Sequence, residues 1–200
     1  MDFLEGFLLG PIWSDTEYET RRHTGFYWFV GWLTLGCYLW LQIKPGTASG
    51  LLGLPVMTPI VIFLILLLGL PFACRYYYRV NFVIKGLIIA AELIKLSAAF
   101  LAFFQNIMPR YTLNTATLPE DLLEYVNQTI AKWTGSFESL GQGLGMLVGI
   151  VTGGLQVVLT MLVILLAATV IPALFLLVIQ LLQRGLDLVV HRFVFQDIDI

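Results

Sequence analysis

Residues 139–183 read SLGQGLGMLVGIVTGGLQVVLTMLVILLAATVIPALFLLVIQLLQ, and this stretch decides the fold. It contains no Asp, Glu, Lys or Arg and is bounded by Glu138 and Arg184. As a single helix it would be about 68 Å long, because each helical residue rises about 1.5 Å. The hydrocarbon core of a bilayer is only about 30 Å thick. The stretch therefore predicts a membrane-spanning helix, with a surplus that one crossing does not need.

The surplus predicts a break within the stretch. Thr152, Gly153 and Gly154 form the natural break point, since glycine weakens a helix. Residues 155–182 then make the span, with Pro172 as an internal kink. Residues 140–154 become a separate glycine-rich helix that re-enters the membrane, lies on its surface or projects from it.

Four glycines recur at four-residue intervals before this break, at Gly141, Gly145, Gly149 and Gly153. Glycines at this spacing lie along one side of a helix and let another backbone approach closely. The partner is either a helix of the same chain or the same helix of an identical subunit. We expect the second arrangement, a closed ring of subunits with Gly145 and Gly149 at the contact.

Three earlier runs are also apolar enough to cross a bilayer: 24–43, 51–74 and 81–104. Prolines in the second of these predict a bend or an irregular first turn, because proline lacks a backbone donor: Pro55, Pro59 and Pro71. Hydrophobic residues make up 58% of the chain and charged residues 12%, against about 25% charged in ordinary soluble proteins. The predicted fold is an all-α polytopic integral membrane protein with four transmembrane helices.

The remaining segments are expected to flank the bilayer. Residues 1–23 predict an interfacial segment whose lipid-facing side chains would be Phe3, Phe7, Leu8, Ile12 and Trp13. Residues 105–139 form the only extended polar stretch and contain an amphipathic helix over 118–132. The tail, 184–200, ends with alternating apolar residues that could add as a strand to a cytoplasmic protein partner: Phe195, Ile198 and Ile200.

The distribution of basic residues predicts the orientation. With four spans and both termini cytoplasmic, seven basic residues lie inside (Arg21, Arg22, Arg75, Arg79, Lys85, Arg184 and Arg192) and three outside (Lys44, Arg110 and Lys132). This asymmetry follows the positive-inside rule. A fifth crossing by 140–154 would remove it. We therefore expect four spans in a bacterial cytoplasmic membrane.

Lys85, Glu92 and Lys95 interrupt the third span. Their spacing places them on one helical face, and an unpaired charge in the bilayer costs about 2.5 to 3.5 kcal/mol, so this face should point toward protein or water. Two interpretations follow. Glu92 and Lys95 neutralise each other while Lys85 reaches the interface, or the three residues form a polar stripe along a water-filled path or a partner subunit.

Chemistry-bearing motifs are scarce. Cys37 and Cys74 lie in or beside apolar runs, and the sequence shows no metal-ligand spacing, catalytic triad or phosphate-binding loop. We therefore expect no cofactor, no metal and no enzymatic activity. The net charge of −2 without a basic cluster argues against nucleic acid as a partner.

The expected function is a homo-oligomeric pore or channel-like assembly in the lipid bilayer. Small four-span chains recur as membrane components of larger bacterial complexes, defence systems among them, which extends this expectation by analogy of architecture. The alternatives are a non-conducting anchor or scaffold that recruits a cytoplasmic partner, and a small transporter subunit that uses Glu92 and Lys95 for coupling.

Overall fold

The computed structural model describes residues 2–13, 24–44, 53–107, 114 and 116–194, and the regular structure within these ranges is helical throughout. Four helices are long and apolar enough to cross a membrane: α2 (Thr24–Ile43), α4 (Met57–Cys74), α5 (Phe82–Ile107) and α7 (Gln142–Val194). Shorter elements complete the chain: α1 (Asp2–Leu9), η2 (Tyr77–Arg79), α6 (Leu118–Ser136) and η3 (Glu138–Leu140). The protein is an all-α integral membrane protein, as the composition predicts.

The first helix to span the membrane has the predicted bounds, whereas the second begins later than its charge-free run. The α2 helix covers the predicted 24–43. The α4 helix begins at Met57 instead of Leu51, after a turn in which the Thr58 amide donates to the Pro55 carbonyl at 2.8 Å. Pro59 is tolerated in the first helical turn, where its missing donor would have no intrahelical partner.

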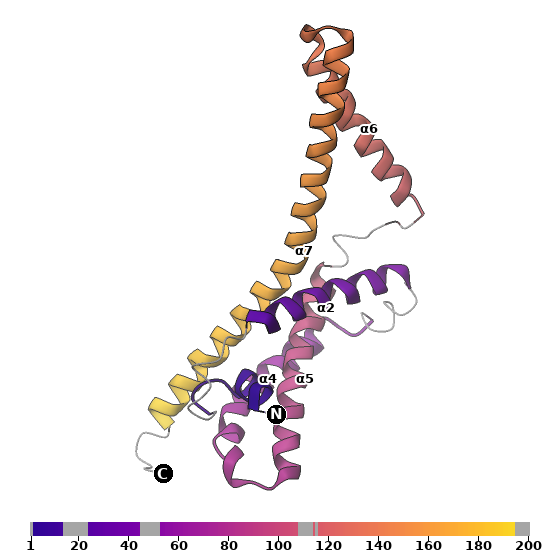
Figure 1. Ribbon diagram of the computed structural model, residues 1–200. Helices are drawn as coiled ribbons and strands as arrows, with labels where there is room; N and C mark the ends of the chain where they lie inside the picture. Colours follow the sequence, from indigo (N-terminus) through magenta and orange to yellow (C-terminus); the bar gives the residue numbers. More distant parts are fainter. Residues whose placement is uncertain (1, 14–23, 45–52, 108–113, 115, 195–200) are drawn as a thin grey trace.

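The α7 helix is continuous over 53 residues, so the predicted break at 152–154 is wrong. At about 1.5 Å per residue its length is about 80 Å. Each interior glycine costs about 1 kcal/mol relative to alanine. Packing of α6 against Gly149 and Gly153 offsets that cost at these two positions. Pro172 is also accommodated inside the helix, and the ribbon changes direction where α7 passes α2 (Figure 1).

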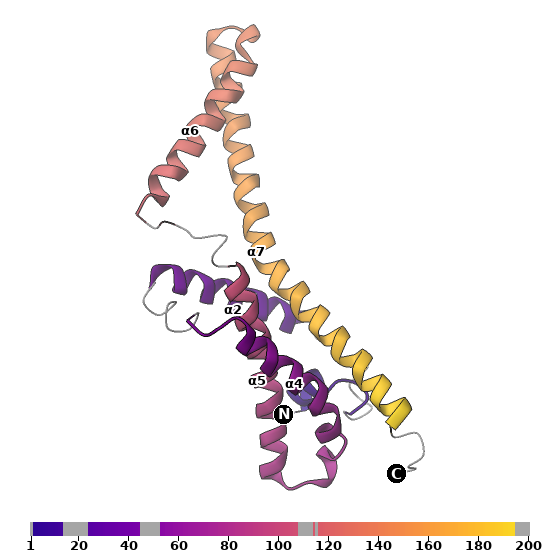
Figure 2. The same cartoon turned by 180° about the vertical axis from the view of Figure 1, so that it is seen from behind.

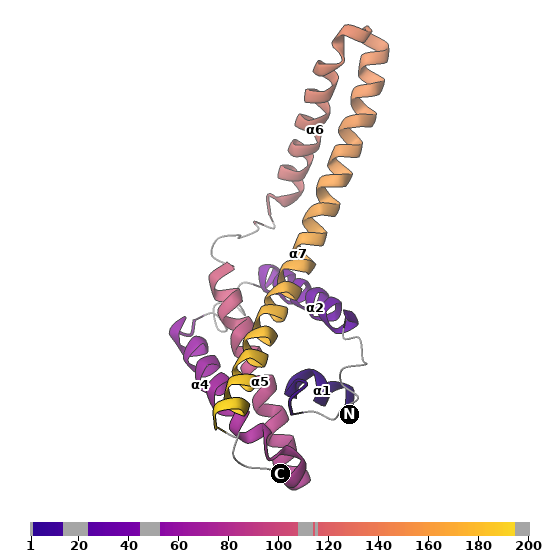
Figure 3. The ribbon, with the colours of Figure 1, turned by 90° about the vertical axis from the view of Figure 1, so that its left-hand side faces the viewer.

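Two antiparallel helical hairpins dominate the architecture. The α4 and α5 helices form one hairpin, and α6 folds back along the first half of α7 to form the other (Figures 1 and 3). The α6–α7 hairpin projects away from the remaining helices, whereas α2 crosses α7 obliquely near the middle of the molecule (Figure 2). The glycine-rich segment is therefore one of the two helices of an arm that projects from the rest of the molecule. Its placement relative to the membrane remains a prediction.

The end opposite the arm gathers three distant parts of the chain. Leu9 and Trp13 pack in one apolar cluster with Cys74, Tyr77 and Ile88. The Trp13 ring also lies 6.0 Å from the imidazole of His191, between ring centroids. The topology that places 1–23, 75–85 and 184–200 on one side of the membrane remains a prediction.

The α1 helix packs inside the protein, contrary to the expectation of a lipid-facing segment. Phe7, Leu8 and Leu9 are almost completely buried, and Phe7 and Leu8 pack with Val30 of α2 and Leu176 of α7. Trp13 is buried as well, and Ile12 is half-buried, whereas the side chain of Phe3 lies outside the described part of the structure. A short apolar segment has the same pattern whether its apolar face meets lipid or protein, which explains the error.

Candidate functional site

A buried ion pair lies at the centre of the end that holds α1. The Lys95 ammonium forms a salt bridge with the Glu92 carboxylate one turn earlier on α5. Both side chains are only 1% exposed. The charged face of α5 therefore points into the protein, as the cost of exposing charge to lipid predicts. This geometry matches the interpretation in which Glu92 and Lys95 neutralise each other.

The last part of α7 adds polar side chains to this pair. Lys95 Nζ donates to Gln183 Oε1 at 2.8 Å, and Asp187, one turn farther on, is 2% exposed. From α4, the Cys74 thiol donates to Glu92 Oε1 at 3.8 Å. We call Cys74, Glu92, Lys95, Gln180, Gln183 and Asp187 the polar cluster. Three helices contribute to it.

The polar cluster holds the C-terminal end of α1. Gln183 Nε2 donates to the Leu8 carbonyl at 2.9 Å, and Gln180 Nε2 donates to the Phe7 carbonyl at 3.4 Å. These carbonyls belong to the last turn of α1, where no intrahelical donor is available. The hydroxyl of Tyr27 donates to Gln180 Oε1, so α2 orients the same side chain.

Gly10 lets the chain leave α1 directly above Asp187. Its φ of +80° is a left-handed conformation that glycine adopts without strain, and a Cβ at this position would lie 3.8 Å from Asp187 Oδ2. The α1 helix therefore packs against the polar cluster and covers it.

Lys85 lies apart from the polar cluster. Its ammonium lies 5.3 Å from the Tyr77 ring centroid and 5.6 Å from that of Tyr78, both cation–π distances. Tyr77 is buried, and this burial, followed by the nearby Glu5 carboxylate, raises the pKa of its hydroxyl. In the described residues the predicted polar stripe is thus divided into a buried pair and a lysine that reaches the tyrosines at the end of the hairpin.

The glycines of α7 form the second notable arrangement. A Cβ on Gly145 would lie 2.5 Å from the Phe137 carbonyl oxygen, and one on Gly149 would lie 2.5 Å from the Thr134 Cα. For Gly153 the corresponding distance, to the Ile130 Cα, is 2.9 Å. Gly149 and Gly153 therefore bring the backbones of α6 and α7 together, and Gly145 packs against the turn that follows α6. This is the same-chain alternative for the glycine pattern.

Gly141 has a different role from the other three. It precedes α7 with a φ of +91°, and among the described residues no atom lies within 4 Å of its would-be Cβ. It serves the turn between η3 and α7. The contact between subunits predicted for these glycines remains a prediction.

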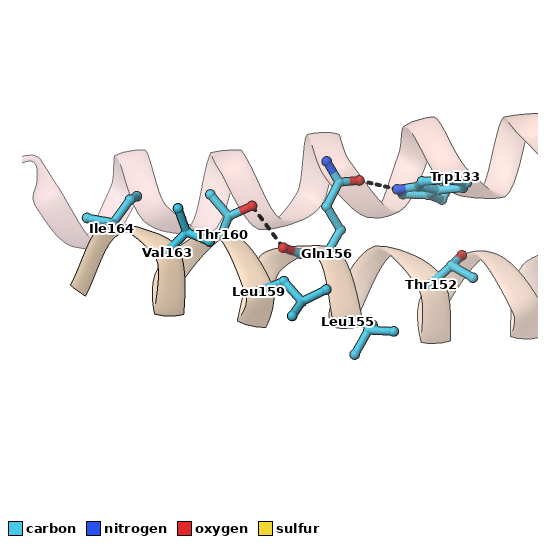
Figure 4. Close-up of a pocket in the computed structure, with 8 residues that line it drawn as sticks. All are labelled: Trp133, Thr152, Leu155, Gln156, Leu159, Thr160, Val163 and Ile164. Carbon is cyan, nitrogen blue, oxygen red and sulfur yellow. Dashed lines mark hydrogen bonds between the residues drawn. The ribbon is translucent and has the colours of Figure 1, made fainter. Parts of the chain in front are cut away.

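Polar contacts join the two helices of the arm beside the glycines. The Trp133 indole donates to Gln156 Oε1, and the Tyr125 hydroxyl donates to Thr160 Oγ1 at 3.2 Å. Figure 4 shows the Gln156 side chain extending from α7 to Trp133 on α6, next to an apolar flank that includes Leu155 and Leu159. The sequence does not reveal these pairs, because their members are 23 and 35 residues apart.

The other predicted sites have the following outcomes. The tail residues Phe195, Ile198 and Ile200 lie outside the described residues. No group of three or more His, Cys, Asp or Glu side chains in the described part of the chain could hold a metal ion. Comparison with protein-family models, curated proteins and solved structures finds no match to this chain. Functional inference therefore rests on the chain's own residues.

Proposed function

We propose that the protein is a subunit of a homo-oligomeric, pore- or channel-like assembly in a bacterial cytoplasmic membrane, with both termini in the cytoplasm. One observation carries this proposal. The α7 helix presents a row of exposed large apolar side chains in its projecting half: Leu144, Leu147, Val151, Leu155, Val158 and Leu162. We call these six residues the outer row.

Most of the outer row lies outside the part of α7 that one bilayer crossing needs. Counted back from Arg184, a crossing needs about 20 residues, or about 26 with a tilt of 40°. Residues 144–155 lie beyond either limit. The neighbouring α6 exposes Glu120, Asp121 and Glu124, which do not suit lipid. An exposed apolar surface of this length in water requires a cover.

A second copy of the arm is the cover that we propose. The outer row lies on the side of α7 away from Gly145, Gly149 and Gly153, because its members fall on the opposite helical face. The glycine face already holds α6, so the outer row is the surface that α7 can offer to another subunit. Copies arranged around a closed axis would cover every outer row and surround a central path with α7 helices.

Oligomer size in mild detergent and ion flux into liposomes together test the proposal. We expect the wild-type protein to elute as a defined oligomer of at least three subunits and to conduct ions after reconstitution. Val151→Glu places a charge in the outer row and should yield smaller species. Leu123→Glu on α6 is the matched control, because Leu123 and Val151 are exposed to similar degrees, 61% and 69%. A monomeric wild-type protein would contradict the proposal.

A non-conducting anchor is the second candidate, and the polar cluster favours it. Glu92 and Lys95 are paired, buried and covered by α1, so these charges do not line an open aqueous path in this conformation. Flux separates the two candidates. A defined oligomer that conducts no ions would support the anchor, whereas ion flux that Val151→Glu abolishes would support the pore.

A further inference from the structure

A groove between α2 and α7 is a separate feature from the outer row and the polar cluster. Its volume is about 480 Å³, within the range of roughly 300–1,000 Å³ typical of ligand pockets. The α2 wall includes Thr24, Tyr27 and Trp28. The α7 wall includes Leu174, Leu177 and Arg184.

Close contacts hold the walls of this groove in place. Gly31 of α2 packs directly against the backbone of Thr169 on α7, where a side chain on the glycine would have no space. On the other side, the Tyr27 hydroxyl donates to Gln180. The groove therefore follows from how α2 crosses α7.

The groove has an apolar part and a cationic end. Leu174 is 55% exposed and Trp28 45%, and both belong to helices apolar enough to face lipid. Arg184 is the first charge after the apolar run of α7, and Thr24 is the first residue of α2, whose N-terminus carries a partial positive charge.

We propose that this groove binds an anionic glycerophospholipid, with its phosphate at Arg184 and the N-terminus of α2 and an acyl chain along Leu174 and Leu177. Basic sites between transmembrane helices at the cytoplasmic surface suit anionic head groups. Arg184 also interacts within the chain, but a guanidinium has five N–H donors and can serve a phosphate as well. Trp28 has the amphipathic ring expected at head-group level.

Lipid binding to the delipidated full-length protein, measured by native mass spectrometry, tests this site. We expect phosphatidylglycerol to bind at least about tenfold more tightly than phosphatidylcholine, because both lipids carry the phosphate but the choline ammonium cancels its charge and is repelled by Arg184. Arg184→Gln should remove this preference. Arg192→Gln, at an exposed arginine in the last turn of α7, is the matched control and should retain it. Equal affinity of the wild-type protein for both lipids would overturn the proposal.

A groove-filling variant tests the apolar part independently of charge. Ala173 also lines the groove, so Ala173→Phe should weaken binding of both lipids while every cation remains. If Arg184→Gln fails to fold, the head-group preference of the wild-type protein and the result for Ala173→Phe decide the question. Displacement of phosphatidylglycerol by inorganic phosphate, or unchanged binding in Ala173→Phe, would indicate an anion site without an acyl-chain groove and contradict the proposal. Neither result depends on whether the protein conducts ions.

Discussion

The two helical hairpins of this protein pack by different means. The α4–α5 hairpin contains Gly69 and Gly86, yet among the described residues no atom lies within 4 Å of a Cβ built on either. Side chains such as Leu70 and Ile88 fill its interface. In the α6–α7 hairpin, Gly149 and Gly153 bring the backbones together. Glycine content alone therefore does not show where helices approach closely.

The difference follows from the surroundings of each hairpin. Both helices of the α4–α5 hairpin are apolar enough to span the bilayer, and its buried charges are matched within the protein. The α6 helix is amphipathic with exposed acids, so only one face of it can pack. Close backbone contact and polar pairs hold that face against α7. The following experiments, ordered by expected effect, test this contrast.

Topology gives an all-or-none effect. In a protein whose Cys37 and Cys74 have been replaced, single cysteines at Thr117 and Asp199 should react with a membrane-impermeant thiol reagent from opposite sides. Thr117 precedes α6, outside the membrane in our proposal, whereas Asp199 follows α7. Labelling of both positions from the same side would rule out the four-span topology, and with it the proposed side of the membrane for each of the two positions.

Removal of one partner of the buried ion pair should have the next largest effect. Glu92→Leu leaves the Lys95 ammonium buried without its carboxylate, which costs about 3–5 kcal/mol of unfolding free energy. We expect low yield and a lower thermal midpoint in detergent. The double variant Glu92→Leu/Lys95→Met removes both charges and should recover most of the loss. Equal stability of Glu92→Leu and wild type would show that the pair contributes little.

Alanine substitutions at two glycines of α7 should have opposite effects on stability. Gly149→Ala introduces a Cβ 2.5 Å from Thr134 and should destabilise the arm by about 1–3 kcal/mol, the usual cost of overpacking. Gly154→Ala, in the interior of the same helix, meets no described atom within 4 Å and should stabilise the helix by about 0.5–1 kcal/mol. Proteolysis of the arm measures both effects. Tolerance of Gly149→Ala would contradict the close packing.

The polar pair of the arm should have the smallest effect. Trp133→Phe removes the indole donor to Gln156 but keeps an aromatic ring beside Phe137, against which Trp133 stacks at 5.9 Å between centroids. A single hydrogen bond contributes about 0.5–1.5 kcal/mol. We expect a small decrease in the resistance of α6 to proteolysis, with the α4–α5 hairpin unchanged. A loss as large as that of Gly149→Ala would show that the tryptophan does more than donate this bond.

Charge and hydropathy predict the spans well, because the energetic cost of charge in lipid acts on each residue separately. The 24–43 run therefore matches α2, and α5 lies within a few residues of its predicted bounds. The continuity of α7 could not be predicted in the same way, because the helical cost of Gly149 is local whereas its compensation comes from Thr134 on another helix.

The site was only partly predictable for the same reason. The face that carries Glu92 and Lys95 follows from helical spacing, but Gln183 lies 88 residues from Lys95 in the sequence. The hydrogen bonds from Gln180 and Gln183 to α1 span still larger separations. Only the tertiary fold shows that Phe7 and Leu8, which were expected to face lipid, are buried in a helix that covers the polar cluster.

The unbroken α7 helix also has a mechanical consequence. It touches α2 backbone to backbone at Gly31 and Thr169, which makes this crossing a natural fulcrum. Gly145 lies about 36 Å from Thr169 on one side and Asp187 about 27 Å on the other, at about 1.5 Å per residue. Rigid pivoting would therefore move Asp187 opposite to the arm, by about three quarters of its displacement. A displacement of the arm would therefore be coupled to a displacement of Asp187, beside which α1 ends.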